Sequence, residues 1–215
     1  MNVILLGAPC AGKGTLAKSL EKQYGIFQLS TGEMFRELVE EKNHYGLRAR
    51  DEYWGKGNLV PDKETTELVK IMLEKEEYKK GVIFDGFPRT ILQAKNLEKL
   101  LTNLQVLFLD VSEENLILRA QNRRVCTDCK TTYSLLLDPQ KEEAVCDFCS
   151  GELIKREDDC LIKDRIEVYK NQTEPLLGFY GEARVWKIDA NKSPGEVLLQ
   201  TQNLLSTNLK TLQNS

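Results

Sequence analysis

Short apolar runs alternate along the chain with longer stretches in which apolar side chains recur every three or four positions. The short runs predict buried strands, and the periodic stretches predict amphipathic helices. Strands that alternate with helices predict an α/β fold in which a parallel sheet carries helices on both faces. The predicted strands are Val3–Leu6, Phe27–Leu29, Val82–Phe84, Val106–Leu109 and Val185–Ile188. In such a sheet, ligands bind at the carboxyl ends of the strands.

A glycine-rich turn directly follows the first predicted strand. It reads GAPCAGKGT over residues 7–15 and leads into a predicted helix. A strand, a GxxxxGK loop and a helix in this order point backbone N–H groups and a helix N-terminus at one spot, which predicts a polyphosphate site. The alternative is a strand-to-helix turn in an unrelated α/β protein.

Two positions depart from the strict P-loop pattern. Lys13 is expected to reach the outer phosphates, but Gly14 separates it from the hydroxyl of Thr15. The strict pattern has Ser or Thr directly after the lysine, so Mg²⁺ is expected to be held mainly by phosphates and water. Cys10 stands where glycine would be easier on the backbone, and we expect it to slow turnover without moving the site.

Polar residues also follow the second and third predicted strands. Ser30 and Glu33 form an S-x-x-E capping box that predicts a helix start. Asp85 ends the third strand, where it is interpreted as the anchor of a Mg²⁺–water shell; alternatively, it caps the helix that starts near Thr90. Arg89 lies on a turn stiffened by proline, and we expect its guanidinium to lie over the phosphate cradle.

Four of the six cysteines form two CxxC pairs separated by sixteen residues: Cys126, Cys129, Cys146 and Cys149. This spacing predicts one tetrahedral site for zinc, or for another tetrahedral metal such as iron. Two disulfides are the alternative, which a reducing cytosol disfavours. Because all four ligands are thiolates, the metal is expected to be structural. Cys10 and Cys160 are interpreted as free thiols.

The composition is that of an ordinary globular protein: 215 residues, 41% hydrophobic and 29% charged. One core with a smaller inserted module is expected. Since no run of 18 apolar residues and no signal-peptide pattern occurs, we expect a cytoplasmic protein. The single histidine, His44, lies in a polar stretch and is expected at the surface. A mechanism that needs a histidine base is therefore disfavoured.

The net charge of −3 disfavours a general nucleic-acid binder, which needs excess Lys and Arg. Arginines nevertheless bracket the cysteine-rich insert. Guanidinium groups meet phosphate oxygens bidentately, so we interpret the cluster as phosphate contacts rather than as solvated surface charges. The cluster comprises Arg119, Arg123, Arg124, Arg156 and Arg165.

Together these segments resemble the adenylate kinase family, in its form with a long zinc-binding lid. The similarity covers essentially the whole chain. STG followed by an arginine, combined with DGFPR and a downstream glutamine, is specific to nucleoside monophosphate kinases of this type. The matching segments are residues 7–15, STGEMFRE from Ser30, GNLVPD from Gly57, FDGFPRT from Phe84, NRRVC from Asn122 and NQTEPLLGFY from Asn171.

The resemblance implies reversible transfer of the γ-phosphoryl group of Mg-ATP to AMP, giving two ADP. The implied catalytic residues are Lys13, Asp85, Arg89, Arg123, Arg156 and Arg165. The implied ATP site comprises Cys10, Ala11, Gly12, Lys13, Gly14, Thr15, Arg119, Arg123, Thr132, Tyr133 and Lys192. The implied AMP site comprises Thr31, Arg36, Asn58, Leu59, Val60, Gly86, Phe87, Pro88, Arg89, Gln93, Arg156 and Arg165.

The resemblance also implies individual roles. Arg119 and Tyr133 would flank the ATP base, and carbonyls around Lys192 would read its edge. Thr31, the backbone near Val60 and Gln93 would read the AMP adenine, while Arg36 and Arg89 would hold the AMP phosphate. The implied domains are a P-loop core (1–30, 61–122 and 161–215), an AMP-binding domain (31–60) and a zinc-stapled lid (123–160).

Three departures from the family pattern stand out. Arg156 and Arg165 are nine residues apart, two fewer than is usual in the family, so either Arg165 reaches the phosphates by a different hinge path or the catalytic geometry is looser. Lys130 and Ala190 occupy positions where the family has glycine.

Rival functions are a related kinase that uses UMP, CMP or a GTP donor, a zinc-ribbon nucleic-acid-binding protein on an inactive P-loop scaffold, and a nucleotide sensor that closes without transfer. We expect a monomer that binds neither nucleic acid nor membrane.

Overall fold

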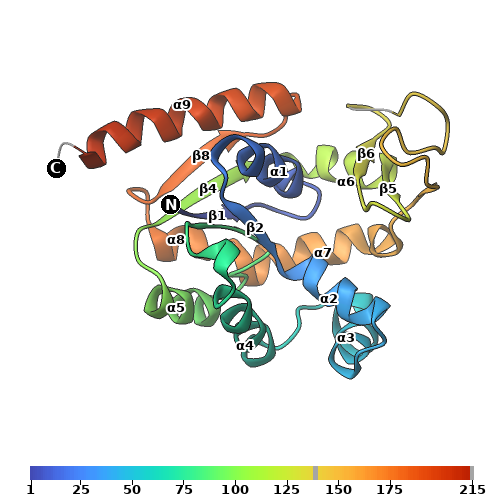
Figure 1. The fold of residues 1–215 in the computed structure, drawn as a ribbon, viewed down its shortest axis with the longest axis horizontal. Helices are drawn as coiled ribbons and strands as arrows, with labels where there is room; N and C mark the ends of the chain where they lie inside the picture. The colour runs from blue at the N-terminus through green and yellow to red at the C-terminus, as the bar shows by residue number, and fades with distance from the viewer. Residues whose placement is uncertain (138–139, 214–215) are drawn as a thin grey trace.

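Five parallel strands form the central sheet in the order β2-β3-β1-β4-β8 (Figure 1). The computed structural model describes residues 1–137 and 140–213. It confirms the predicted fold class and all five predicted strands, each within one or two residues. The strands are β1 (Asn2–Leu6), β2 (Phe27–Ser30), β3 (Val82–Asp85), β4 (Leu104–Asp110) and β8 (Val185–Asp189).

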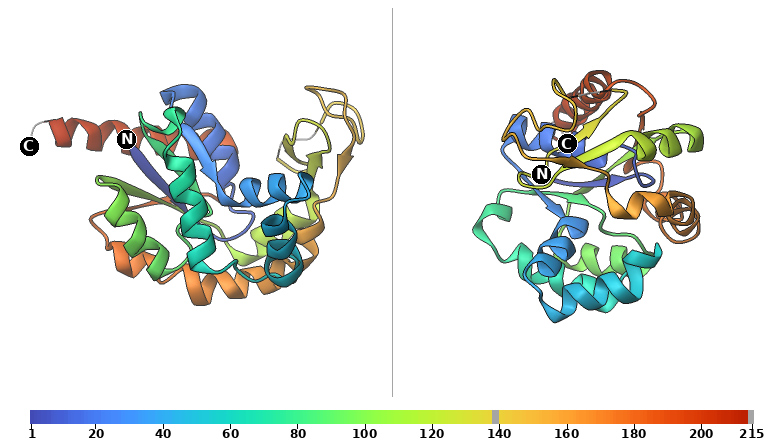
Figure 2. Two further views of the ribbon diagram at one scale, coloured as in Figure 1. Left: turned by 60° about the horizontal axis from the view of Figure 1, so that its bottom comes forward. Right: turned by 90° about the vertical axis from the view of Figure 1, so that its right-hand side faces the viewer.

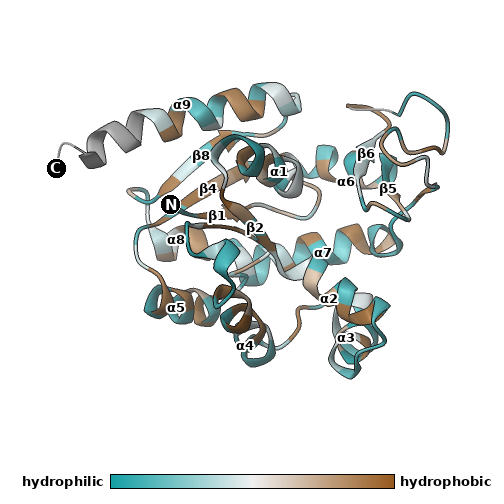
Figure 3. Ribbon diagram, viewed as in Figure 1, coloured by the Kyte–Doolittle hydropathy of each residue, from teal (hydrophilic) through white to brown (hydrophobic). Residues whose placement is uncertain are grey.

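The central strands β1, β3 and β4 are largely buried on both faces, which explains why they are continuous apolar runs. Along β1, Val3 and Leu5 point into one core, whereas Ile4 and Leu6 point into the other. Successive side chains of a strand point to opposite faces, so each apolar residue packs under a different layer of helices. Strands β1 and β4 form the apolar centre of the molecule (Figure 3).

Helices cover each face of the sheet, as the alternation predicts. One face packs against α1 (Lys13–Tyr24), α6 (Glu113–Asn122), α7 (Ile162–Val168) and α9 (Pro194–Gln213). The other packs against α4 (Asp62–Leu73), α5 (Ile91–Leu100) and α8 (Leu176–Tyr180). Short helical turns lie at Glu76–Tyr78 and Tyr169–Thr173. None of the described helices has the length and apolar character needed to cross a membrane.

A helical insertion follows β2. It comprises α2 (Thr31–Glu40), α3 (His44–Arg48) and two short turns, Ala49–Tyr53 and Trp54–Lys56. The predicted cap is confirmed, because the Ser30 side chain accepts from the Glu33 N–H. The insertion has its own small core around Phe35, Ala49 and Val60. His44 is exposed, as expected.

A second insertion, between α6 and α7, forms a small antiparallel sheet. Its strands are β5 (Arg123–Cys126), β6 (Thr132–Ser134) and β7 (Leu153–Ile154), in the order β6-β5-β7. We call this insertion the lid. It projects from the rest of the molecule (Figure 2). A short helical turn at Glu157–Leu161 leads from it directly into α7.

Candidate functional site

The glycine-rich turn between β1 and α1 depends on residues with unusual backbone conformations. A Cβ on Gly7 would lie 2.9 Å from the Leu109 carbonyl oxygen, so only glycine fits against β4. Gly12 and Cys10 both have left-handed conformations, with φ of 98° and 66°. Cys10 therefore occupies a position that favours glycine, as the sequence suggested.

Lys13 is the first residue of α1, and its side chain points back toward the start of the glycine-rich turn. Its ammonium group donates to the carbonyl oxygens of Gly7 (2.7 Å) and Ala8 (2.8 Å). Burial lowers the pKa of Lys13 to about 8, although the nearby Asp85 carboxylate opposes this shift. A half-buried ammonium group without a directly paired carboxylate favours an anionic ligand.

Asp85 lies at the carboxyl end of β3, close to the start of α1. Its Oδ2 accepts from the Gln28 amide at 3.0 Å and would lie 3.5 Å from a Cβ on Gly14. The alternative that Asp85 caps the next helix is wrong, because Thr90 caps α5 by accepting from the Gln93 N–H. Asp85 is therefore a carboxylate beside the P-loop.

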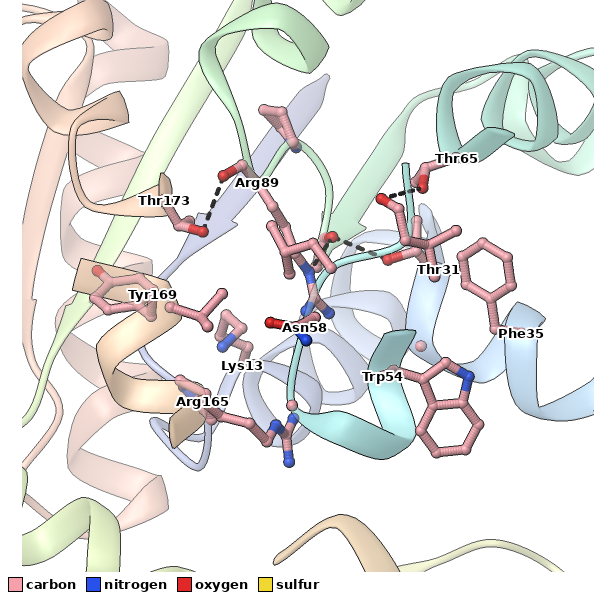
Figure 4. A pocket seen from close by; sticks show the side chains of 18 of the residues that line it. Lys13, Thr31, Phe35, Trp54, Asn58, Thr65, Arg89, Arg165, Tyr169 and Thr173 are labelled. Atoms are coloured by element: carbon pink, nitrogen blue, oxygen red, sulfur yellow. Dashed lines mark hydrogen bonds between the residues drawn. The ribbon is translucent and has the colours of Figure 1, made fainter. Parts of the chain in front are cut away.

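A single pocket lies between the P-loop, the helical insertion, the β3–α5 loop and α7 (Figure 4). The structure brings many predicted site residues together here, although they come from distant parts of the sequence. The predicted residues that line it are Lys13, Thr31, Arg36, Asn58, Leu59, Val60, Gly86, Pro88, Arg89, Gln93 and Arg165.

Other predicted residues lie outside this pocket lining: Cys10, Ala11, Gly12, Gly14, Thr15, Asp85, Phe87, Arg119, Arg123, Thr132, Tyr133, Arg156 and Lys192. The Phe87 side chain is 1% exposed and packs in the hydrophobic core with Phe84. The predicted role of Phe87 in the AMP site stays a prediction, in which its backbone rather than its ring would be available to a ligand.

Arg89 enters the pocket from the β3–α5 loop (Figure 4). Its Nε donates to the Gly86 carbonyl at 2.7 Å, and the Thr31 hydroxyl donates to the same oxygen at 2.9 Å. The Thr173 hydroxyl also donates to the Arg89 carbonyl. Burial, and then the charge of Arg165, lower the pKa of Arg89 to about 10. These contacts orient a half-buried cation toward the pocket.

Arg36 supplies a second half-buried cation from α2. Its guanidinium lies 3.3 Å from the position of a Cβ on Gly32, so the absence of a side chain there leaves it room. Burial, and then the charge of Arg156, lower the pKa of Arg36 to about 10. Burial is the main cause of the lowered pKa of both Arg36 and Arg89, and the charge of a neighbouring arginine adds to each shift.

At the junction between the lid and α7, three arginines pair with two adjacent carboxylates. Arg123 forms an ion pair with Asp159. Asp158 binds Arg165 at 2.8 Å and Arg156 at 3.3 Å. Burial alone would raise the pKa of Asp158, but Arg165 and Arg156 hold that pKa below its usual value. Both carboxylates thus form ion pairs with the predicted phosphate-binding arginines.

Sequence reasoning missed Asp158 and Asp159. Their only signal was an acidic pair soon after Arg156. It also missed the aromatic lining of the pocket, Phe35, Trp54 and Tyr169. Arg165 lies on α7 and lines the pocket despite the short spacing from Arg156, because the turn at Glu157–Leu161 continues without a break into α7.

The region predicted to hold the ATP base lies beyond the P-loop. Arg119 donates to the carbonyl oxygens of Ala11 (3.3 Å) and Ala190 (2.6 Å), and so joins the P-loop to the β8–α9 loop. Lys192 and Thr132 are exposed. Tyr133 differs from prediction. It is 4% exposed in the lid interior, so its ring does not flank a nucleotide base in this structure.

The four predicted metal ligands converge in the lid. Their Sγ atoms all lie within 4.8 Å of one another, with 3.4 Å between Cys126 and Cys149 and 3.5 Å between Cys129 and Cys146. Tetrahedral zinc with Zn–S bonds of about 2.3 Å places sulfurs about 3.8 Å apart, so the set fits zinc. The Tyr133 hydroxyl lies 3.4 Å from Cys146 Sγ and accepts from the Asp147 N–H, which positions this half of the cluster.

Comparisons with known proteins agree on one family. The sequence model of the adenylate kinase family matches residues 5–185. An adenylate kinase of Clostridium novyi is 44% identical over 211 residues, covering 94% of this chain and 97% of its own. The adenylate kinase of Caldicellulosiruptor bescii is 46% identical, covering 84% and 86%. That of Staphylococcus aureus is 40% identical, covering 95% and 99%.

Proposed function

The chain belongs to the adenylate kinase family, and we propose that the residues around its pocket carry out phosphoryl transfer from Mg-ATP to AMP, giving two ADP. One observation supports this assignment most strongly. Lys13, Arg89 and Arg165, which come from three separate segments, line one pocket together with Thr31 and Gln93. Such convergence of cations suits a polyphosphate bound between two nucleotides.

The chemistry needs positioning and charge rather than a base. The acceptor phosphate is already ionised, and the transferring group passes through a metaphosphate-like transition state with charge on its equatorial oxygens. Lys13, Arg123, Arg156 and Arg165 stabilise that charge, and Arg89 with Arg36 holds the AMP phosphate. Preorganised cations of this kind act most strongly where water is excluded.

Without nucleotide, the carboxylates of Asp158 and Asp159 occupy the arginine side chains that would otherwise bind phosphate oxygens; we call this their placeholder role. They hold Arg123, Arg156 and Arg165 close to the pocket while balancing their charge. When ATP and AMP bind, the guanidinium groups exchange part of these ion pairs for bidentate contacts with phosphate. Lid closure then completes the site and excludes water, which would otherwise hydrolyse ATP.

Two metals have distinct places in this proposal. Mg²⁺ accompanies ATP and neutralises developing charge on its phosphates; Asp85, beside the P-loop, would anchor its hydration shell. Zinc would be held by Cys126, Cys129, Cys146 and Cys149. Four thiolates leave no position for a water, so zinc there would staple the lid and take no part in the reaction.

The proposed division into domains follows from the separate hydrophobic clusters of the helical insertion and the lid. Residues 31–60 would form the AMP-binding domain around Phe35, and residues 123–160 the lid around its cysteines. Residues 1–30, 61–122 and 161–215 would form the P-loop core. ATP, AMP and ADP are the proposed small-molecule partners. The monomeric state, the absence of nucleic-acid and membrane binding and the cytoplasmic location stay predictions.

AMP, UMP and CMP differ in their bases, so the residues proposed to contact the base decide among them. Thr31 and Gln93 are both buried and line it, which favours AMP over UMP or CMP. Family membership does not favour a nucleic-acid-binding function for the cysteine-rich insert or a sensor without transfer. A coupled assay with each monophosphate tests the choice, and faster turnover with UMP would overturn it.

The test of the proposed mechanism compares two arginines of the lid region. Arg156→Ala should lower kcat by at least about 100-fold while changing ATP affinity far less, because its contact is made in the transition state. Arg124→Ala is the matched control, since within residues 1–137 and 140–213 the Arg124 side chain donates to the backbone carbonyls of Gln121 and Arg123 and forms no ion pair. An unchanged kcat in Arg156→Ala would remove this residue from the mechanism.

A further inference from the structure

The side-chain amide of Gln93 is held at both ends. Its Oε1 accepts from the backbone N–H of Arg89 at 2.7 Å, and its Nε2 donates to Asp62 Oδ1 at 2.8 Å. Gln93 is 1% exposed and lines the pocket. Asp62 was not among the residues singled out from the sequence.

These two partners allow only one orientation of the amide. A backbone N–H can only donate, and a carboxylate can only accept. Rotating the Gln93 amide by half a turn would place its NH₂ against the Arg89 N–H and its oxygen against the Asp62 carboxylate. Both contacts would then be repulsive, so the assignment of oxygen and nitrogen follows from the chemistry of the neighbours.

Asp62 is itself fixed in place. It is the first residue of α4, and its second oxygen, Oδ2, accepts from the Thr90 hydroxyl at 2.9 Å. The Thr90 oxygen in turn accepts from the Gln93 N–H at 3.2 Å, as the cap of α5. Asp62, Thr90 and Gln93 therefore form a closed hydrogen-bonded ring that ties α4 to α5 at the edge of the pocket.

We propose that Asp62 is a specificity-determining positioning residue that locks the Gln93 amide in the orientation that accepts adenine and rejects 6-oxopurines. The proposal rests on the proposed function, in which Gln93 reads the base of AMP. With one position of each atom used by Arg89 and Asp62, Oε1 keeps a free lone pair and Nε2 keeps a second N–H.

The locked amide matches one purine and opposes the other. Adenine presents an amino donor at N6 and an acceptor at N1, which pair with Oε1 and Nε2 respectively. Hypoxanthine presents an acceptor at O6 and an N1–H donor, the reverse pattern. A site built to hydrogen-bond one pattern rejects its reverse strongly, because buried polar groups are left unpaired.

The experiment compares AMP and IMP as acceptors from ATP, in wild-type protein and in Asp62→Asn. Wild type should prefer AMP by at least about 100-fold in kcat/KM. An asparagine carboxamide both donates and accepts, so Asp62→Asn removes one of the two restraints on the Gln93 amide, while the Arg89 N–H still favours the original orientation. Asp62→Asn should therefore reduce the AMP/IMP ratio by about tenfold or more. The change should appear in the KM of the monophosphate, with the KM of ATP and the kcat for AMP within about threefold of wild type.

Glu67→Gln is the matched control, because Glu67 is a carboxylate on the same helix that pairs with Lys70 at the exposed surface. It should leave the AMP/IMP ratio unchanged. If Asp62→Asn proves too unstable to assay, Asp62→Thr carries the same test, since a hydroxyl also donates and accepts.

The outcomes separate the two proposals. No ADP from ATP and AMP in wild type would contradict the proposed function itself. Activity with AMP, combined with an unchanged AMP/IMP ratio in a folded Asp62 variant, would overturn the lock and leave the function standing. IMP turnover equal to that of AMP in wild type would also overturn the lock.

Discussion

Asp158 Oδ2 lies 2.8 Å from a guanidinium nitrogen of Arg165, with both side chains largely buried beside the pocket. The other oxygen of the same carboxylate binds Arg156 at 3.3 Å. The Asp158 carboxylate thus forms ion pairs with two proposed catalytic arginines, one on each side of it in the sequence. This relationship explains how Arg165 is held near the pocket, and it makes the charge balance of the site testable.

Replacing Asp158 with Asn should separate stability from nucleotide binding. The two arginines would lose a buried counter-charge, so the free energy of unfolding should fall by about 1–3 kcal/mol. A bisubstrate analogue that joins ATP and AMP through their phosphates should restore more stability to the variant than to wild type, because phosphate replaces the missing charge. Thermal unfolding with and without the analogue measures both effects.

Glu157→Gln is the control for this substitution, because Glu157 is an exposed neighbour of Asp158. It should leave the unfolding temperature unchanged. Equal stabilisation of wild type and Asp158→Asn by the analogue would contradict the placeholder role of the carboxylate.

The lowered pKa of Lys13 predicts a pH dependence of ATP use. The free enzyme should lose the Lys13 proton as the pH rises through about 8, so kcat/KM for ATP should fall above that value. For this group alone, the sign for stability is opposite. Between the folded pKa and the ordinary value of 10.5, the unfolded chain binds more protons, so stability without nucleotide should rise with pH.

A pH–rate series from about pH 7 to about pH 10 measures this profile, with ATP varied at saturating AMP. The arginines of the pocket keep their charge over most of this range, since the pKa values of Arg36 and Arg89 are about 10. A constant kcat/KM for ATP up to pH 10 would contradict the role of a charged Lys13.

Removing the metal should destabilise the lid while leaving the chemical groups of the pocket intact. The lid core contains few apolar residues, so metal ligation replaces a hydrophobic core. Chelation, or Cys146→Ser, should lower the unfolding temperature by about 5–10 °C. Turnover at low temperature should decline only as far as the lid unfolds.

Cys160→Ser provides the control for the metal experiment, since Cys160 is an exposed cysteine outside the four-cysteine cluster. It should behave as wild type, with and without chelator. Identical unfolding of the chelated and untreated protein would show that the cluster does not staple the lid.

Lys130 joins the lid to the helical insertion that follows β2. Its ammonium group lies 2.6 Å from Glu40 Oε1 at the end of α2, and its backbone has the left-handed φ of 58°. Because both side chains are more than half exposed, the pair should be weak and screened by salt. Glu40→Gln should weaken binding of the bisubstrate analogue by about two- to fivefold at low salt, with no difference at high salt.

Lys130→Gly removes the same ion pair and also relieves the left-handed lysine. The double variant should bind the analogue as Lys130→Gly does, because the second substitution has no interaction left to remove. Independent, additive effects would show that the two residues do not act together.

Local patterns predicted the parts of the fold that depend on local rules. Apolar runs identified the strands most clearly at β1, β3 and β4, which are largely buried on both faces, and the Ser30 cap followed from its spacing to Glu33. The four cysteines were equally clear, since metal ligation constrains spacing. These features needed no knowledge of which distant segments meet.

Features that depend on tertiary contacts were harder to predict. An acidic pair after Arg156 looks like a solvated turn until the fold places it between three arginines. Tyr133 appeared available to a nucleotide, yet its ring completes the lid interior, where apolar side chains are scarce. Asp62 lies in the GNLVPD segment noted in the sequence, but its contacts with Thr90 and Gln93 become visible only once the fold brings α4 and α5 together.

A crystal structure with the bisubstrate analogue and Mg²⁺ tests the central claim most directly, which is that cations from separate segments converge on one polyphosphate. The account predicts that Lys13, Arg123, Arg156 and Arg165 all lie within hydrogen-bond distance, about 3 Å, of phosphate oxygens. Arginines still paired only with Asp158 and Asp159, and phosphates contacted by the P-loop alone, would contradict it.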